Sequence, residues 1–262
     1  MQKIESRENR KFKWLNSLKI KKNRDREGVF VAEGLRLIRE IPGDQRVKCF
    51  AASESFAAAQ NLSAYEKQAE LILLPDGMFA SICDTEHPQG ILAVCEKLDW
   101  NMDVVFAGQN PFFLLAEELN DPGNLGTVIR TADACGVDAV FLSDGSVDLY
   151  NPKVLRATMG SLFHVPVFQG VDLAELSAKL HRRGVPLYAA HLRGDCFPYA
   201  LDLRESCAFL IGNEARGLSE RASALCSRLV KIPMPGQAES LNASIAAGVL
   251  MYEVVRQRLA GK

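Results

Sequence analysis

A loop of seven residues, followed by an arginine, is the first feature of the sequence that packing alone does not explain. Residues 120–126 read Asn-Asp-Pro-Gly-Asn-Leu-Gly, and Arg130 lies one helical turn beyond the last glycine. Aspartate, proline and glycine favour a turn, and Asn124 can cap the helix that follows. A tight strand-to-helix turn does not account for Arg130, because a cation near a helix N-terminus is mildly unfavourable. We therefore expect an anion such as a phosphate to meet Arg130.

Two further loops have the same mixture of glycine and polar side chains. Residues 211–217 read Ile-Gly-Asn-Glu-Ala-Arg-Gly, and the two glycines allow the backbone to approach a ligand closely. Taken alone, this loop is also compatible with a capped turn. Residues 232–244 contain two prolines and a glycine, which fix an exposed loop, and either Ser240 or Asn242 can begin the last helix.

The segments around these loops alternate between strand-like and helix-like patterns. Apolar runs at 111–119, 138–143, 164–168, 186–192 and 207–212 predict strands, and helices are expected between them and at the C-terminal end. The run at 111–119 is apolar on both faces, as a buried parallel strand requires. This alternation predicts an α/β fold. The first two loops follow predicted strands, where open α/β sheets place ligands.

A second α/β block precedes residue 97. Strands are predicted at 28–34, 47–53, 70–75 and 90–96, and the stretch 97–111 is the best candidate for a linker. Residues 1–26 contain ten Lys or Arg against three Asp or Glu, a net charge of +7, whereas the whole chain carries −1. This basic segment favours either contact with a polyanion or a solvated amphipathic helix, and charge alone leaves both open.

Several classes of protein are excluded or disfavoured by absences in the sequence. No apolar run approaches the ~20 residues of a transmembrane helix, and we expect no secretory signal because no apolar region follows the first charges. The seven cysteines are scattered without a CxxC pair, which predicts reduced thiols in a cytoplasmic protein. The four histidines have no metal-ligand spacing, so no metal is expected. Dinucleotide-binding and P-loop fingerprints are absent.

Together the three loops resemble a known family. NDPGNLGTVIRTA, FLIGNEARGLS and IPMPGQAESLNASIAAGVLMYE, in this order, are similar to the signature motifs of the SpoU family, the RNA ribose 2′-O-methyltransferases of the SPOUT superfamily. Ser6, Asn9, Arg24, FVAEG at 30–34 and HPQGILAV at 87–94 resemble the family's small ribosomal-protein-like RNA-binding domain. The resemblance implies an RNA-binding domain at 1–97, a linker at 98–110 and a methyltransferase domain at 111–262.

The resemblance also implies a mechanism and partners. The methyltransferase domain is expected to contain a deep trefoil knot and to bind S-adenosylmethionine through Gly212, Ile232 and Leu241, with Met234 nearby. The expected reaction is methyl transfer to a ribose 2′-hydroxyl, with rRNA favoured as substrate. A tRNA methyltransferase and a catalytically silent RNA-binding protein of the same fold are the alternatives. A homodimer with a shared active site is implied, and the last helix offers Ile245, Val249 and Tyr252 as its apolar stripe.

Roles for individual residues follow from the motif match. Arginine stays protonated, so Arg130 is expected to act electrostatically on the target phosphate or the developing oxyanion rather than as a base. Asn120 and Asn124 would orient the nucleotide, and Glu214 would hold Arg130 or accept a hydrogen bond from the hydroxyl. Ser240 and Asn242 would complete the pocket. The expected RNA contacts are Arg10, Lys11, Lys21, Lys22, Arg24, Lys153 and Arg156.

Overall fold

The computed structural model describes residues 1–261 and divides into two compact units. Unit 1 comprises residues 1–99 with 150–163, and unit 2 comprises 100–149 with the chain from 164 onward. Residues 100–110, predicted as part of the linker, belong to unit 2. The predicted domains also differ from these units at 150–163, a segment that was expected within the methyltransferase domain. It packs with unit 1 because the Tyr150 ring stacks on Phe30, with ring centroids 4.9 Å apart, and because Leu155 is buried. The domain boundaries themselves stay a prediction.

Unit 1 is built on a five-stranded sheet with the order β1-β4-β3-β5-β2. Its strands are β1 (Gln2–Lys3), β2 (Val29–Glu33), β3 (Val47–Ser53), β4 (Glu70–Leu74) and β5 (Ile91–Glu96), and β5 runs antiparallel to β2 and β3. Strands β2 to β5 match the sequence predictions. The helices are α1 (Arg10–Ser17), α2 (Lys21–Glu27), α3 (Leu35–Arg39), α4 (Glu54–Ala59), α5 (Ser63–Gln68), α6 (Asp76–Ile82) and α9 (Pro152–Thr158), with the 3-10 turn η1 (Ser161–Phe163). Phe12 and Leu15 of α1 enter the core, which leaves the basic residues outside.

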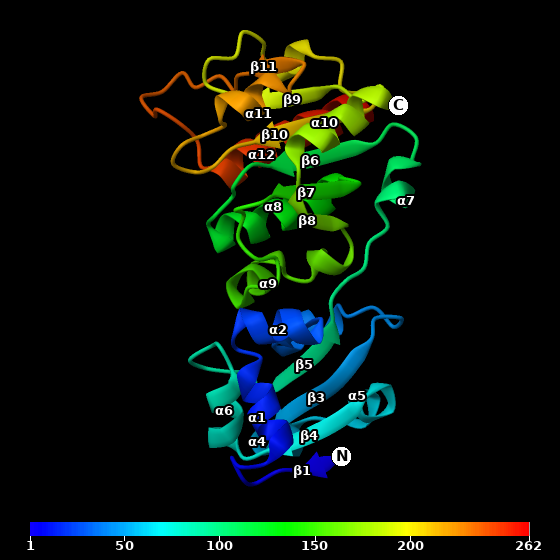
Figure 1. Cartoon of the computed structure of the whole chain (residues 1–262), viewed down its shortest axis with the longest axis vertical. Helices are drawn as coiled ribbons and strands as arrows, with labels where there is room; N and C mark the ends of the chain where they lie inside the picture. The colour runs from blue at the N-terminus through cyan, green and yellow to red at the C-terminus, as the bar shows by residue number, and fades with distance from the viewer. Residues whose placement is uncertain (262) are drawn as a thin grey trace. The chain divides into compact units, whose positions relative to one another are not determined.

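Unit 2 contains a six-stranded parallel sheet with the order β11-β9-β10-β6-β7-β8 (Figure 1). The strands are β6 (Phe112–Ala116), β7 (Ala139–Ser143), β8 (Val167–Val171), β9 (Leu187–Ala190), β10 (Cys207–Ile211) and β11 (Arg228–Val230). Every residue of β6, β7 and β10 is buried, which explains their continuous apolar runs. The helices are α7 (Met102–Phe106), α8 (Pro122–Cys135), α10 (Leu173–Arg182), α11 (Glu220–Ala224) and α12 (Ala243–Ala260), with the 3-10 turn η2 (Pro198–Ala200).

The expected linker at 98–110 is not a bare connection. It forms α7, and Phe106 of this helix is buried in the core of unit 2 beside Phe113. All seven cysteines are free and six are buried, as expected for reduced thiols, and burial raises the pKa of the Cys49 thiol to about 12. None of the helices formed by residues 1–261 has the length and apolarity needed to cross a membrane.

The order of the strands in unit 2 defines where a ligand is expected. From β6 the chain proceeds to β7 and β8 on one side, and the later strands β10, β9 and β11 lie on the other side. Neighbouring strands β6 and β10 therefore form the topological switch point, and their carboxyl ends carry the loops after residues 116 and 211. Open parallel sheets bind ligands in the crevice at this point.

Candidate active site

The first loop begins helix α8, but not in the way the sequence suggested. Asp121 is the N-cap, since its Oδ1 accepts a hydrogen bond from the backbone N–H of Asn124 at 2.8 Å. The predicted capping role of Asn124 is therefore wrong. Because α8 begins at Pro122, Arg130 is its ninth residue and lies beyond the second turn, so the expected unfavourable position near the helix N-terminus is also wrong. Arg130 is exposed, and no hydrogen bond or ion pair engages its side chain within residues 1–261.

Glu214 joins the second loop to the first. Its carboxylate accepts hydrogen bonds from the backbone N–H of Asn120 at 3.2 Å, from that of Asp121 at 3.0 Å and from the side-chain amide of Asn124 at 3.1 Å. Burial acts to raise the pKa of Glu214, but the hydrogen bonds from Asn124 and the backbone outweigh it and hold the pKa below its usual value. Glu214 is therefore an anion that orders the 120–124 turn. The expected contact between Glu214 and Arg130 is not found in the described protomer.

Asn124 links this carboxylate to the third loop. Its side chain is 9% exposed, and its Oδ1 accepts a hydrogen bond from Nδ2 of Asn242 at 2.9 Å. Asn242 is the N-cap of α12, because its Oδ1 accepts hydrogen bonds from the backbone N–H groups of Ser244 and Ile245. Glu214, Asn124 and Asn242 thus form one chain of hydrogen bonds through all three loops. Ser240 is exposed and does not join it.

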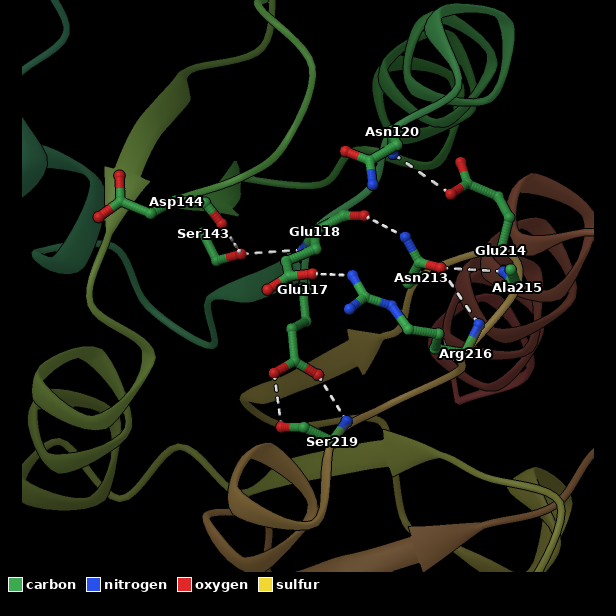
Figure 2. Close-up of polar contacts among 10 residues, drawn as sticks. All are labelled: Glu117, Glu118, Asn120, Ser143, Asp144, Asn213, Glu214, Ala215, Arg216 and Ser219. Carbon is green, nitrogen blue, oxygen red and sulfur yellow. Dashed lines mark hydrogen bonds and ion pairs between the residues drawn. The ribbon is translucent and has the colours of Figure 1, made fainter.

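A second set of contacts holds the other side of the 213–217 loop (Figure 2). The loop closes on itself through backbone hydrogen bonds between Asn213 and Gly217, at 2.9 and 3.1 Å. The Asn213 side-chain amide donates to the carbonyl oxygen of Glu118 at 2.8 Å, and the Arg216 guanidinium pairs with the Glu118 carboxylate. Glu117 accepts hydrogen bonds from the backbone N–H and the hydroxyl of Ser219, at 2.8 and 2.6 Å. Side chains of the loop therefore contact the end of β6 at several points.

The sequence reasoning did not identify Glu117, Glu118, Asn213 or Arg216 as parts of this arrangement. Their partners are about a hundred positions apart along the chain, so local spacing gave no indication of them. One signal was available, namely two consecutive glutamates at the carboxyl end of a fully buried strand. Acidic side chains in that position are solvated or paired with a neighbouring loop.

The residues expected to bind the cofactor lie on two loops. A Cβ added to Gly212 would lie 2.3 Å from the carbonyl carbon of Gly217, so only glycine allows the loop to close as it does. Ile232, Met234 and Leu241 are half-buried on the irregular segment that follows β11. No intramolecular hydrogen bond engages the backbone of 232–241 in the described chain, so its N–H and C=O groups are available to a ligand. The individual cofactor contacts stay a prediction.

The predicted RNA contacts fall into three groups. Arg10, Lys22 and Lys153 are exposed and have no ion pair within residues 1–261. Lys11, Lys21 and Arg156 are each paired with a carboxylate, namely Glu70, Asp25 and Asp84. The assignment of Arg24 is corrected, since it is only 5% exposed and its Nη1 donates to the carbonyl oxygens of Leu18 and Lys19, both at 3.0 Å. Arg24 supports the α1–α2 connection rather than presenting its charge to RNA.

The expected apolar stripe of the last helix is exposed. Ile245, Val249 and Tyr252 of α12 are 53%, 42% and 55% exposed, while Ala247, Leu250 and Met251 are fully buried. The buried face of α12 packs on α8 and β10, so the stripe is not needed for packing within the chain. Among residues 1–261 no group of three side chains is arranged to hold a metal ion.

Comparison with known proteins finds a matching family model for each of the two parts of the chain. Residues 111–252 match the model of the SpoU rRNA Methylase family, and residues 9–93 match the MRM3-like substrate binding domain. The chain is 36% identical to the 23S rRNA (guanosine(2553)-2′-O)-methyltransferase RlmP of Bacillus subtilis, over 97% of this chain and 99% of that protein. It is 31% identical to the 23S rRNA (uridine(2479)-2′-O)-methyltransferase of Streptomyces viridochromogenes, over 99% and 94%.

Solved structures agree with these sequence relationships. The SpoU methyltransferase AviRb from Streptomyces viridochromogenes, in complex with the cofactor AdoMet, superposes with a TM-score of 0.86 at 29% identity. The match covers 97% of this chain and all of that one. An AdoMet-bound rRNA methyltransferase from Sinorhizobium meliloti gives a TM-score of 0.84 at 27% identity, with 97% of each chain covered.

Proposed function

This chain belongs to the SpoU rRNA methylase family, and we propose on that basis that it transfers a methyl group from S-adenosylmethionine to a ribose 2′-hydroxyl of rRNA. The observation that carries the proposal is the full-length similarity to rRNA 2′-O-methyltransferases, which includes the substrate-binding domain as well as the methyltransferase domain. Structures of relatives with bound AdoMet support the cofactor. A silent RNA-binding protein is less well supported, since Arg130, Glu214 and Asn242 are all present. A tRNA substrate is less well supported, since the full-length relatives are named as 23S rRNA methyltransferases.

The reaction is a displacement at carbon. The ribose 2′-oxygen would form a bond to the methyl carbon as the carbon–sulfur bond of bound S-adenosylmethionine breaks. The neutral thioether S-adenosylhomocysteine would leave, and the hydroxyl proton would pass to solvent water. S-adenosylmethionine supplies the activated methyl group. Because a 2′-hydroxyl is a weak acid, the site must stabilise the oxyanion that develops during attack. Arg130 is the unpaired cation of α8 and is proposed for that role, since a guanidinium stabilises charge without titrating.

The hydrogen-bonded chain of Glu214, Asn124 and Asn242 is proposed to orient the nucleotide by fixing the three loops relative to one another. Each of these side chains is engaged with another loop or a helix N-terminus, so their own positions are determined. Asn120 and Ser240 have exposed side chains and are proposed to contact the RNA or the cofactor. Gly212, Ile232, Met234 and Leu241 are proposed to line the cofactor site, with hydrogen bonds from the backbone of 232–241.

A deep trefoil knot is proposed for unit 2, whose strand β11 lies in close contact with the loop after β9. The loop after β9 passes against β11, since His191 N–H donates to the carbonyl oxygen of Val230 and Lys231 N–H donates to that of Cys196. A Cβ on Gly194 would lie 2.7 Å from the backbone of Val230 and Lys231, so the two segments are in direct backbone contact. The deep trefoil knot expected for the superfamily is supported by the match to the SpoU family and by the superposition on solved SpoU methyltransferases.

A homodimer is proposed because two features of the protomer have no packing or pairing partner within the described chain. Ile245, Val249 and Tyr252 form an exposed apolar stripe on α12, and Arg130 on the adjoining α8 has no partner in the described chain. A two-fold interface places the same patch of both subunits together, so one contact would cover both stripes. We further propose that Arg130 of one subunit serves the cofactor loops of the other, and that the enzyme acts in the cytoplasm, where rRNA is found.

Labelled methyl transfer tests the proposal directly. The purified protein is incubated with methyl-labelled S-adenosylmethionine and with rRNA or tRNA from cells that lack the gene. We expect label in rRNA, unchanged by a chelator, and a loss of ~10²–10³ in rate for Arg130→Ala, the loss typical of one preorganised donor. Because Arg130 is exposed and unpaired, the variant should unfold at the wild-type temperature. Label in tRNA alone, or an Arg130→Ala rate above about a tenth of wild type, would contradict the proposal.

A further inference from the structure

Glu118 occupies an unusual backbone position at the switch point of the unit 2 sheet. It follows the end of β6 with φ = 48°, in the left-handed region that side chains other than glycine rarely adopt. Such a conformation costs of order 1 kcal/mol and persists only where the surroundings fix it. Here hydrogen bonds fix both the backbone N–H and the carbonyl oxygen of Glu118. The Glu118 N–H donates to Oγ of Ser143 at 2.9 Å, and its carbonyl oxygen accepts from Nδ2 of Asn213 at 2.8 Å.

The carboxylate of Glu118 extends these contacts to a third point. It pairs with Arg216, on the opposite side of the 213–217 loop from Glu214, as Figure 2 shows. The loop backbone between them is short and closed, since Oδ1 of Asn213 accepts the N–H groups of Ala215 and Arg216 at 3.0 and 3.1 Å. A movement of Arg216 is therefore transmitted to Glu214, two residues away.

We propose that Glu118 is a positioning residue for methyl transfer. Through Arg216 and Asn213 it fixes the 213–217 loop, and the loop in turn holds the Glu214 carboxylate against the 120–124 turn. Glu118 itself touches no reacting group. This inference rests on the proposed function, because its consequence for the rate requires the 120–124 turn to be part of the active site.

The effect is on position rather than on stability. The Glu118 and Arg216 side chains are 43% and 69% exposed, and an ion pair exposed to that degree adds little to the free energy of folding. Displacement of a catalytic turn by about 1 Å can nevertheless cost on the order of 10²-fold in rate. A defect in Glu118 should therefore lower kcat while the protein stays folded and the KM for RNA is unchanged.

Charge reversal and its rescue test the proposal on the full-length protein. In Glu118→Arg two guanidinium groups face each other, and we expect kcat to fall about tenfold or more with the KM for RNA within about twofold of wild type. Arg216→Glu, which places two carboxylates face to face, should lower kcat to a similar extent with a similar KM for RNA. The double variant, Glu118→Arg with Arg216→Glu, restores an ion pair of reversed polarity and should recover most of the loss.

Two controls separate this role from general destabilisation. Glu118→Gly keeps the left-handed backbone without strain and removes only the carboxylate, so it should fold well and still lose activity. Arg204→Glu breaks an exposed ion pair of the same kind, with Asp202 at 2.6 Å, and should keep wild-type kcat. A kcat for Glu118→Arg within about twofold of wild type, or no recovery in the double variant, would overturn the proposal.

Hydrogen exchange gives a readout that does not depend on activity. The backbone N–H groups of Asn120 and Asp121 donate to Glu214, so their exchange should accelerate in Glu118→Arg and return to the wild-type rate in the double variant. Unchanged exchange at both amides would refute the positioning role even if the wild type proves inactive on rRNA. An inactive wild type with the expected exchange pattern would instead refute the proposed function alone.

Discussion

Replacement of Asn124 should destabilise unit 2 by more than an ordinary polar-to-alanine change. The side chain is 9% exposed, donates to the ionised Glu214 at 3.1 Å and accepts from Asn242 at 2.9 Å. A hydrogen bond to a charged group contributes ~1.5–3 kcal/mol and a neutral one ~0.5–1.5 kcal/mol. Asn124→Ala should therefore cost about 2–4 kcal/mol, which corresponds to a fall in Tm of roughly 5–15 °C for a unit of this size.

Asn124→Asp makes the same contact repulsive and adds a pH dependence. In the wild type the pKa of Glu214 is lowered, so the stability it contributes is present above its unfolded pKa of ~4.3 and is lost as the pH falls. In the variant two carboxylates face each other, and the pKa of the pair rises above the unfolded value. Its destabilisation is thus largest near neutral pH and shrinks as the pH is lowered and the pair takes up a proton.

Thermal unfolding of both variants against wild type, at a series of pH values, measures these effects. Asn101→Ala is the matched control, since Asn101 is an exposed residue that caps the short helix α7, and its loss should cost only ~1 kcal/mol. The reasoning is refuted if Asn124→Ala is no more destabilised than Asn101→Ala, or if the difference between Asn124→Asp and wild type does not depend on pH.

Three other predictions concern cofactor, RNA and assembly. Gly212→Ala forces backbone atoms apart and should cost about 3 kcal/mol and abolish S-adenosylmethionine binding by calorimetry, whereas Gly43→Ala, with open space at its Cβ and far along the chain from the cofactor loops, should change neither. Lys22→Glu should make the plot of log RNA affinity against log salt shallower, with a change in slope of at least ~0.7. Lys21→Glu should change the slope less, because Lys21 is already paired with Asp25. Equal changes in the two variants would contradict the separation of Lys22 from the ion-paired basic residues. Val249→Arg should sediment as a monomer at micromolar concentration, while a dimer would place the interface elsewhere.

Elements with a strong local signal were predictable from the sequence. The buried strands β6, β7 and β10 are continuous apolar runs, and an amphipathic helix was one of the two interpretations of the basic segment that contains α1. The short strand β11 was not predicted, because three residues carry no periodicity. Helix boundaries were also misjudged, since both Asp121 and Asn124 can cap a helix and only the backbone decides between them.

The site was predictable in its composition and not in its contacts. Glu214, Asn124 and Asn242 were identified by motif, and the structure joins them as one chain of hydrogen bonds. The contacts of Glu214 with the backbone of Asn120 and Asp121 were not predicted. The burial of Arg24 was not predicted either, because charge patterns do not reveal which basic side chains support backbone carbonyls. Long-range partners of this kind depend on the order of strands in the sheet.

The most direct test of the central claim is the position of the transferred methyl group. After reaction with rRNA and labelled S-adenosylmethionine, the modified nucleoside is isolated and its glycosidic bond is cleaved in a mass spectrometer. If the chain is a ribose 2′-O-methyltransferase, the label stays with the ribose fragment, and an RNA with 2′-deoxyribose at the modified nucleotide accepts no methyl group. Label on the base fragment, or undiminished transfer to the 2′-deoxy substrate, would contradict the claim.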